Sequence, residues 1–165
     1  MTHLETPPTS IAHPSSWRLL FRAWLPTLLW IGVIAIESTD YLSAHNTGRV
    51  LYPILHYLFG ITPEQFALIH LVMRKLGHVI GYGMLSFLAF RSWRAIRLRP
   101  GQPAWSMPWA RNAVFLTAVV ASLDEWHQTF IPSRTGTIKD VVLDTAAGLA
   151  AQVVVFLFLR GVEQA

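Results

Sequence analysis

Ionisable residues lie within or directly beside apolar segments of membrane-spanning length, and this combination constrains the fold more than any other feature of the chain. Lys75, His78 and Tyr82 recur at helical spacing within one such segment. Further polar residues end the next segment and begin the last one: Asp124, Glu125, Gln128, Arg134, Asp140 and Asp144. Charge is costly at membrane depth, so ionisable residues there usually pair with one another or line a functional cavity. The sequence therefore predicts one polar cluster inside a helical membrane protein.

The composition agrees with a membrane protein of one domain. Only 13% of the residues are charged, against roughly 25% in soluble domains, and the mean hydropathy is +0.41. A chain of 165 residues is short enough for a single domain. The absence of cysteine excludes disulfides and thiolate chemistry. The basic residues flank apolar runs and form no continuous stripe, so we expect no nucleic-acid partner.

Four apolar segments predict an all-α fold, an integral membrane four-helix bundle that runs up and down. The first segment, residues 19–36, has close to the roughly 20 apolar residues that a bilayer requires. We expect it to be retained, because no small-x-small cleavage site follows it. The other spans are expected over residues 71–90, 110–123 and 140–159, the third continuing through the polar residues 124–128. Thr62, Pro63 and Gln65 predict the start of the second helix.

Shorter features complete the predicted organisation. Residues 49–59 are aromatic and apolar but too short to cross, which favours an interfacial or re-entrant element between the first and second helices. Residues 1–18 are expected to form a disordered cytoplasmic tail, and residues 19–160 the transmembrane domain. Gly77 and Gly81 form a G-x-x-x-G pair that either lets a neighbouring helix approach closely or arises by chance. Gly148 would leave space for a group to enter below Asp144.

The distribution of charge predicts the orientation of the bundle. Basic residues gather at the first helix, in the loop between the second and third helices, and at the C-terminal end. The positive-inside rule then places these segments and both termini in the cytoplasm. The basic residues predicted on that side are Arg18, Arg22, Arg91, Arg94, Arg97, Arg99, Arg111 and Arg160. We therefore expect a multi-pass protein of the cell membrane whose polar cluster lies at the outer face.

The predicted cluster is suited to acid–base chemistry and to binding an anion. Glu125 or Asp124 could act as a base, with His78 as the partner acid or base, if burial tunes their pKa values. Arg134 and Lys75 could hold a phosphate or carboxylate group. The ligand-binding side chains predicted at this site are Lys75, Tyr82, Gln128, Arg134, Asp140, Asp144 and Glu37.

Other kinds of site have less support in the sequence. Several carboxylates and His78 could bind a divalent cation, but no H-E-x-x-H or comparable ligand spacing occurs, and we expect neither a metal nor another cofactor. No G-x-S-x-G elbow or S-x-x-K motif supports a serine nucleophile. The remaining interpretation is a salt-bridge network that only fixes the register of the helices.

The motifs resemble those of the VanZ-like family of membrane proteins. The resemblance covers residues 19–159 and rests on Lys75-x-x-His78-x-x-x-Tyr82, Asp124-Glu125-x-x-Gln128-x-Phe130-x-Pro132-x-Arg134, Asp140, the pair Asp144 and Gly148, and Glu37-Ser38-Thr39. Two positions depart from the family pattern, because Asp144 stands where Asn is usual and Gln152 where a small residue is usual. The resemblance implies a small multi-helix membrane protein. The family's namesake is associated with teicoplanin resistance, as an accessory to glycopeptide-resistance gene sets, and the resemblance supplies no biochemical activity.

Two functions follow from these observations. The first is binding or processing of an anionic envelope lipid or glycan headgroup at the outer leaflet. It leaves open whether the protein is an enzyme and whether the protein contributes to teicoplanin resistance. The second is a non-catalytic membrane accessory or scaffold whose charge cluster only stabilises the bundle. Transport of a small solute or proton is less favoured, because four helices leave little room for a pathway. Membrane lipids are the expected partners, and a homo-oligomer is left open.

Overall fold

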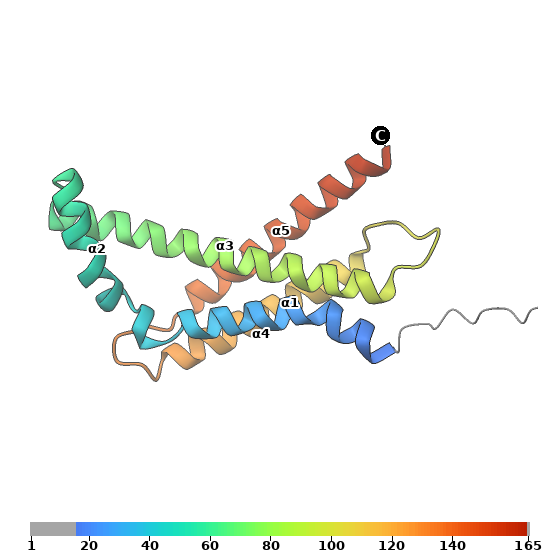
Figure 1. The fold of residues 1–165 in the computed structure, drawn as a ribbon, viewed down its shortest axis with the longest axis horizontal. Helices are drawn as coiled ribbons and strands as arrows, with labels where there is room; N and C mark the ends of the chain where they lie inside the picture. The colour runs from blue at the N-terminus through green and yellow to red at the C-terminus, as the bar shows by residue number, and fades with distance from the viewer. Residues whose placement is uncertain (1–15, 165) are drawn as a thin grey trace, which may run out of the picture.

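The computed structural model describes residues 16–164 of the chain, and this part is entirely α-helical apart from its loops (Figure 1). Its elements are α1 (Ser16–Glu37), the 3-10 helix η1 (Asp40–Leu42), α2 (Ala44–Phe59), α3 (Pro63–Arg97), α4 (Met107–Gln128) and α5 (Ile138–Gln164). The predicted all-α class is confirmed, and each predicted span lies within one helix. The predicted N-terminal tail falls outside the described residues, except for its last three residues, which belong to α1.

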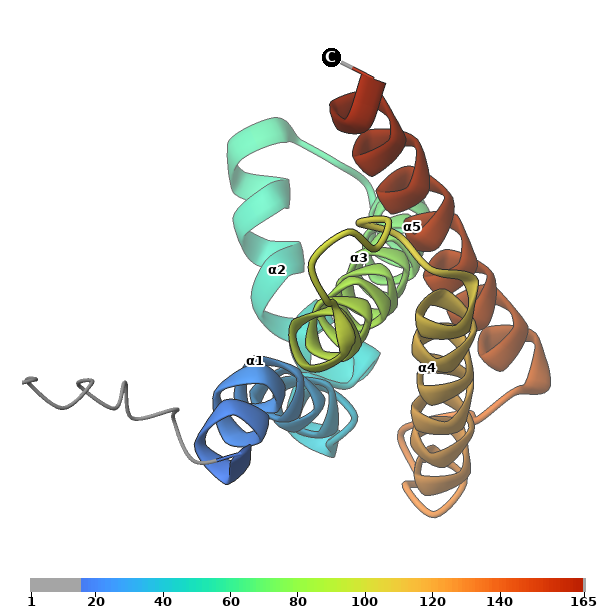
Figure 2. The same ribbon diagram turned by 90° about the vertical axis from the view of Figure 1, so that its right-hand side faces the viewer.

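The long helix α3 lies at the centre of the fold. It contacts α1, α2, α4 and α5, whereas α1 and α5 do not contact each other in the described part of the chain. Figure 2 looks nearly along α3 and shows the other helices around it. The chain runs back and forth, so the start of α1, the loop after α3 and the end of α5 lie towards one end. The loop after α4 lies at the other end, with η1 and α2 (Figure 1).

Local sequence accounts for the helix boundaries around α2 and α3. Thr62 Oγ1 accepts the Gln65 N–H, and Gln65 Oε1 accepts the Thr62 N–H at 2.9 Å, which confirms the predicted capping box. Gly60 ends α2 with φ 64°, a left-handed conformation that costs glycine little. The predicted interfacial element is a helix that already begins at Ala44, and it buries none of its side chains.

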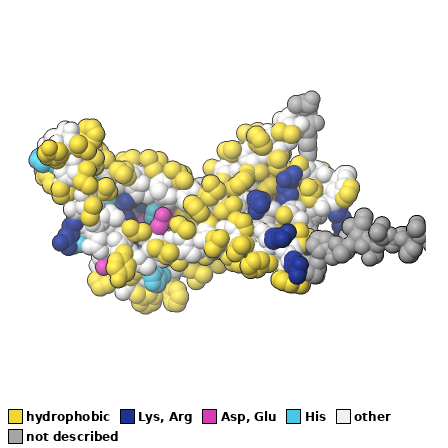
Figure 3. Space-filling view, viewed as in Figure 1, with side chains coloured by type: hydrophobic (Ala, Val, Ile, Leu, Met, Phe, Trp, Pro, Cys, Tyr) yellow, Lys and Arg dark blue, Asp and Glu magenta, His cyan; other side chains and the backbone are white. Residues whose placement is uncertain are grey.

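The interior is rich in small and polar side chains and holds a few large apolar ones such as Leu85 and Phe90, while many other large apolar side chains lie outside. Thr27 and Ser92 are fully buried and hydrogen-bond across α1 and α3 at 2.9 Å. In contrast, Phe158 on α5 is 69% exposed and Leu29 on α1 is 63% exposed. Apolar side chains cover much of the face in Figure 3. Helices in a bilayer pack in this way, because apolar side chains gain nothing by leaving lipid.

A polar ladder runs along the contact between α3 and α5. Ser86 Oγ donates to the Gly148 carbonyl at 2.9 Å, and Gln152 Nε2 donates to the Ser86 carbonyl at 3.0 Å. All of these groups are buried. They form hydrogen bonds with one another that lipid could not provide. Gln152, one of the two departures from the family pattern, is therefore a structural residue of this contact.

Two helices are long and apolar enough to cross a membrane. They are Trp17–Glu37, with mean hydropathy 1.9, and Ile138–Val162, with mean hydropathy 2.1. Only 17% and 28% of their apolar windows are buried, unlike the core helix of a soluble protein. Within the described residues, α3 and α4 do not meet the same criterion. Two of the four predicted spans are thus supported by length and composition.

Gly148, rather than the G-x-x-x-G pair, allows close helix packing. A methyl group at Gly148 would lie 2.9 Å from Thr117 Cγ2 on α4 and 3.4 Å from Ser86 Cβ on α3. At Gly77 and Gly81 a methyl group would meet nothing within 4 Å. Of the two interpretations of the glycine pair, chance fits the structure better than close approach. The expected open space at Gly148 is wrong, because α5 packs there against two helices.

The Gly148→Ala substitution is expected to destabilise the protein by about 1–3 kcal/mol, because neighbouring helices would have to move. Gly161→Ala on the same helix is the matched control, since its methyl group would meet nothing within 4 Å. The control should be neutral or slightly stabilising, because alanine favours helix over glycine. Thermal unfolding in detergent measures both variants, and equal melting temperatures would contradict the packing role of Gly148.

Candidate functional site

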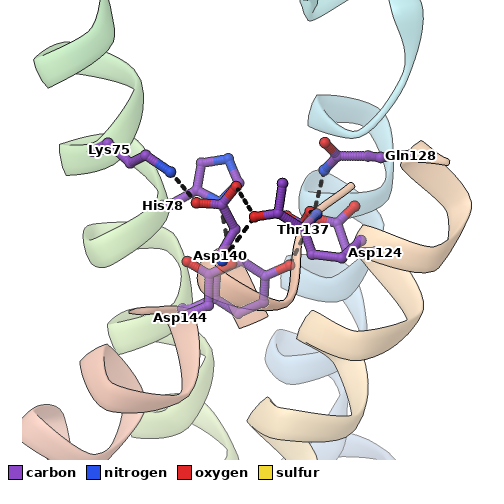
Figure 4. A network of polar contacts seen from close by, with 9 residues as sticks. Lys75, His78, Asp124, Gln128, Thr137, Asp140 and Asp144 are labelled. Carbon is purple, nitrogen blue, oxygen red and sulfur yellow. Dashed lines mark hydrogen bonds and ion pairs between the residues drawn. The ribbon is translucent and has the colours of Figure 1, made fainter. Parts of the chain in front are cut away.

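Three helices and one loop bring polar side chains together near the end where α4 finishes and α5 begins (Figure 4). The labelled residues come from α3 (Lys75 and His78), α4 (Asp124 and Gln128), the loop (Thr137) and α5 (Asp140 and Asp144). These segments are distant in sequence, so the cluster exists only in the folded chain. The structure brings together nearly all of the candidate residues, with Glu37 at the edge.

Two ion pairs link α3 to α5. Lys75 Nζ pairs with Asp140 Oδ1, and the Thr137 hydroxyl donates to Asp140 Oδ2 at 2.9 Å. About one turn deeper, His78 Nδ1 lies 3.2 Å from Asp144 Oδ2. The Asp144 side chain is fully buried, whereas that of Lys75 is 46% exposed. The pairs continue the polar ladder towards the end of the molecule and become more accessible along it.

Asp124 is held by two side chains that the sequence predicted as ligand-binding residues. The Tyr82 hydroxyl donates to Asp124 Oδ2 at 2.8 Å, and Gln128 Nε2 donates to the same oxygen at 3.2 Å. Asp124 Oδ1 is buried and has no hydrogen-bond partner among the described residues. Tyr82 and Gln128 therefore orient a carboxylate, one oxygen of which remains unused.

Glu125 lies beside this group, with only 4% of its surface exposed. Its Oε2 accepts the Thr137 N–H at 2.7 Å, which fixes the carboxylate against the loop that leads into α5. A methyl group at Gly136 would overlap the Glu125 carbonyl oxygen. The loop can therefore pass this close to α4 only with glycine at position 136.

Arg134 fastens the loop to the end of α1. Its Nη2 donates to the carbonyls of Glu37 at 2.5 Å and Thr39 at 2.9 Å. Burial is the main cause that lowers the pKa of Arg134, but an arginine stays protonated in proteins. Glu37 takes part through its backbone, and its exposed side chain lies at the rim of the site. Both residues were predicted to bind a ligand, and the contacts seen here are structural.

A cavity of about 180 Å³ opens beside the cluster. Its lining joins side chains from α3, α4, the loop and α5, with Ala44 at the start of α2: Ala44, Leu71, Arg74, Lys75, His78, Glu125, Gln128, Ser133, Arg134, Thr135 and Asp140. A smaller cavity of about 20 Å³ lies beside Gly77 and Gly81, large enough for one water molecule. The two glycines thus leave room next to the polar groups.

Arg74 and Thr137 belong to the site but were not among the predicted residues. Arg74 lines the cavity and donates to the Leu42 carbonyl at 3.2 Å. Its only signal in the sequence is its position next to Lys75. Thr137 Oγ1 accepts the Asp140 N–H at 3.2 Å, so a cap pattern of Thr three residues before Asp could have identified it.

The Arg134→Lys substitution is expected to lower stability by about 1.5–3 kcal/mol, because one ammonium replaces a fork that holds two carbonyls. The exposed Arg49→Lys provides a control with the same chemical change. Hydrogen exchange of residues 129–137, with thermal unfolding in detergent, measures the effect. Unchanged exchange in this loop would show that Arg134 does not fasten it.

Comparison with known proteins agrees with the resemblance seen in the motifs. The family model VanZ/LLP1 matches residues 21–159, nearly the range over which the motifs were found. No curated protein and no solved structure matches the chain. The family match and the two apolar helices together indicate a membrane protein. Since the match covers most of its length, this chain belongs to the VanZ-like family.

Proposed function

We propose that α1, α3, α4 and α5 all cross the membrane, with both termini in the cytoplasm and α2 at the opposite surface. The apolar exterior of the helices supports this arrangement. Several polar residues that lower the hydropathy of α3 and α4, among them Ser86, Thr117 and Glu125, are buried inside the bundle, where lipid does not reach them. Lys and Arg side chains gather towards the end where α1 starts and α3 finishes (Figure 3), which by the positive-inside rule is the cytoplasmic end.

In this orientation the polar cavity opens near the outer face, where it would bind an anionic headgroup of an envelope lipid or glycan. The observation that carries this proposal is the cavity of about 180 Å³, which is lined by Arg74, Lys75 and Arg134 together with the carboxylates of Glu125 and Asp140. Lys75 is 46% exposed, so its ammonium group is accessible to a ligand. Lysine and arginine are suited to phosphate and carboxylate groups. A headgroup could enter while its acyl chains remain in the bilayer.

Processing of the headgroup by hydrolysis or group transfer would use Glu125 and His78, which both line the cavity. The Thr137 N–H holds Oε2 of Glu125, and Oε1 makes no hydrogen bond with the described residues. Glu125 would accept a proton from the attacking group, and His78 would return a proton to the leaving group. Asp124, oriented by Tyr82 and Gln128, is the alternative base.

The Arg74→Ala/Lys75→Ala variant is expected to co-purify with at least about tenfold less anionic lipid or envelope precursor than the wild-type protein. The reason is that two cationic groups are removed from the lining of the cavity. Arg134 is kept, since it fastens the loop. Arg97→Ala/Arg99→Ala removes two cations at the opposite end and should retain the ligand. Native mass spectrometry from mild detergent compares the three proteins. Equal retention in all three, or no retained anion in the wild type, would contradict the headgroup proposal.

The scaffold function is favoured by a different observation. The ion pairs and hydrogen bonds of Lys75, His78, Tyr82 and Arg134 join α3, α4, α5 and the end of α1. A network of this kind would also stabilise a membrane accessory with no ligand of its own. Any contribution to teicoplanin resistance would then come from the presence of the folded protein in the membrane.

The Lys75→Met/Asp140→Asn variant separates these two functions. Removing both members of the pair leaves no unpaired charge, so we expect the protein to remain folded, whereas Lys75→Met alone should melt at a lower temperature. If the cluster only stabilises the bundle, the double variant should give cells the same teicoplanin susceptibility as the wild type. A folded double variant that changes the susceptibility would rule out a purely structural cluster.

A further inference from the structure

Three carboxylates lie around one histidine in this site. Asp124, Glu125 and Asp144 surround His78, and within residues 16–164 the ion pairs are Lys75 with Asp140 and, when the imidazole is protonated, His78 with Asp144. Lys75 is therefore already paired, and Arg134 donates to backbone carbonyls rather than to a carboxylate. Among the described residues, no cationic side chain other than His78 pairs directly with Asp124, Glu125 or Asp144. Buried charge without a partner is strongly unfavourable, so the site favours an additional cation.

The geometry of three of these residues suits one bound ion. His78, Glu125 and Asp144 each offer a ligand atom within 4.8 Å of the other two. His78 Nδ1 and Asp144 Oδ2 lie 3.2 Å apart, close to the spacing of neighbouring ligands about 2.0–2.2 Å from a single ion.

A second observation points independently to a missing ligand at the same place. Asp144 Oδ1 is buried and has no hydrogen-bond partner among the described residues, although the side chain of Asp144 is fully buried. Buried polar atoms are nearly always paired. A water molecule or an ion would satisfy this oxygen, and the ligand atoms of His78 and Glu125 close by favour the ion.

We propose that His78, Glu125 and Asp144 bind one divalent metal ion of the zinc or manganese class. One imidazole and two carboxylates form a donor set that suits these ions. Three protein ligands leave at least one coordination position open, as in catalytic rather than structural metal sites. His78 and Glu125 both line the cavity of about 180 Å³, so the open position faces the cavity. The Thr137 N–H on Glu125 Oε2 would orient this ligand from outside the metal site.

This metal site does not depend on the headgroup function. The next step does rest on that proposed function: a bound ion would favour a headgroup that carries a phosphate over a neutral glycan. A phosphate oxygen would take the open position while Arg74 and Lys75 contact the remaining oxygens. The bound ion would supply Lewis-acid polarisation of the phosphate. Glu125 and His78 would then serve as metal ligands in place of the acid–base roles given above, and Asp124 would be the remaining base.

The test uses the full-length protein in detergent, stripped with a chelator and titrated with Zn²⁺ or Mn²⁺ alone. We expect one ion per chain by calorimetry and elemental analysis, together with a higher melting temperature in the presence of the ion. Asp144→Asn and Glu125→Gln should each weaken binding at least about tenfold. Glu64→Gln, at the exposed start of α3, removes an acid far from the site and should bind like the wild type. Circular dichroism confirms that each variant is folded.

Two results would overturn the metal site. No saturable binding of either ion to the wild type would show that protons neutralise the buried carboxylates instead. Binding that Asp144→Asn and Glu125→Gln leave unchanged would place the ion elsewhere. Native mass spectrometry of the stripped protein separates this inference from the headgroup function. Retained anionic lipid without ion binding would leave the headgroup function standing, whereas ion binding without any lipid would leave only the metal site.

Discussion

A carboxylate that is fully buried between two helices needs a partner that lipid does not supply, and Asp144 Oδ2 finds this partner in His78. The pair sets the register of α5 against α3. Lys75 and Asp140 then meet about one turn closer to the end of the molecule, and Ser86 meets Gly148 one turn deeper. Because a shift of either helix would separate all of these groups together, the cavity lies between elements that can hardly slide.

The packing of small and polar residues inside the bundle explains how a short chain can keep a polar cavity. Thr27, Ser86, Ser92 and Thr117 let the helices approach closely and satisfy one another or the backbone. Many large apolar side chains lie on the exterior. Cohesion therefore comes from close contact and hydrogen bonds, together with two small apolar clusters that contain Leu85 and Phe90. Removing a buried hydroxyl should be more harmful than shortening an exposed leucine.

The site contains groups of two kinds, which the contacts distinguish. Arg134 donates hydrogen bonds that hold the loop in place. Tyr82 and Gln128 donate hydrogen bonds to Asp124 and orient its carboxylate. Lys75 is partly exposed, and the buried Asp144 Oδ1 has no hydrogen-bond partner among the described residues. The groups that are oriented but not fully used are the ones expected to meet a ligand, because the surrounding contacts have already ordered them.

The sequence by itself determined the features that depend on neighbouring residues. The capping box at Thr62, the position of the four long helices and the spacing of Asp140 and Asp144 on one helix face follow from local hydrogen bonding and helical periodicity. The family motifs also identified most members of the cluster. Only the tertiary structure decided what each member contacts: Arg134 holds α1, Gly148 rather than Gly77 brings helices together, and Arg74 reaches the cavity. His78, Glu125 and Asp144 come from three different helices, so no local spacing could reveal their common geometry. Partners of this kind depend on how whole helices pack, and that packing is the sum of many weak contacts between residues far apart in the chain.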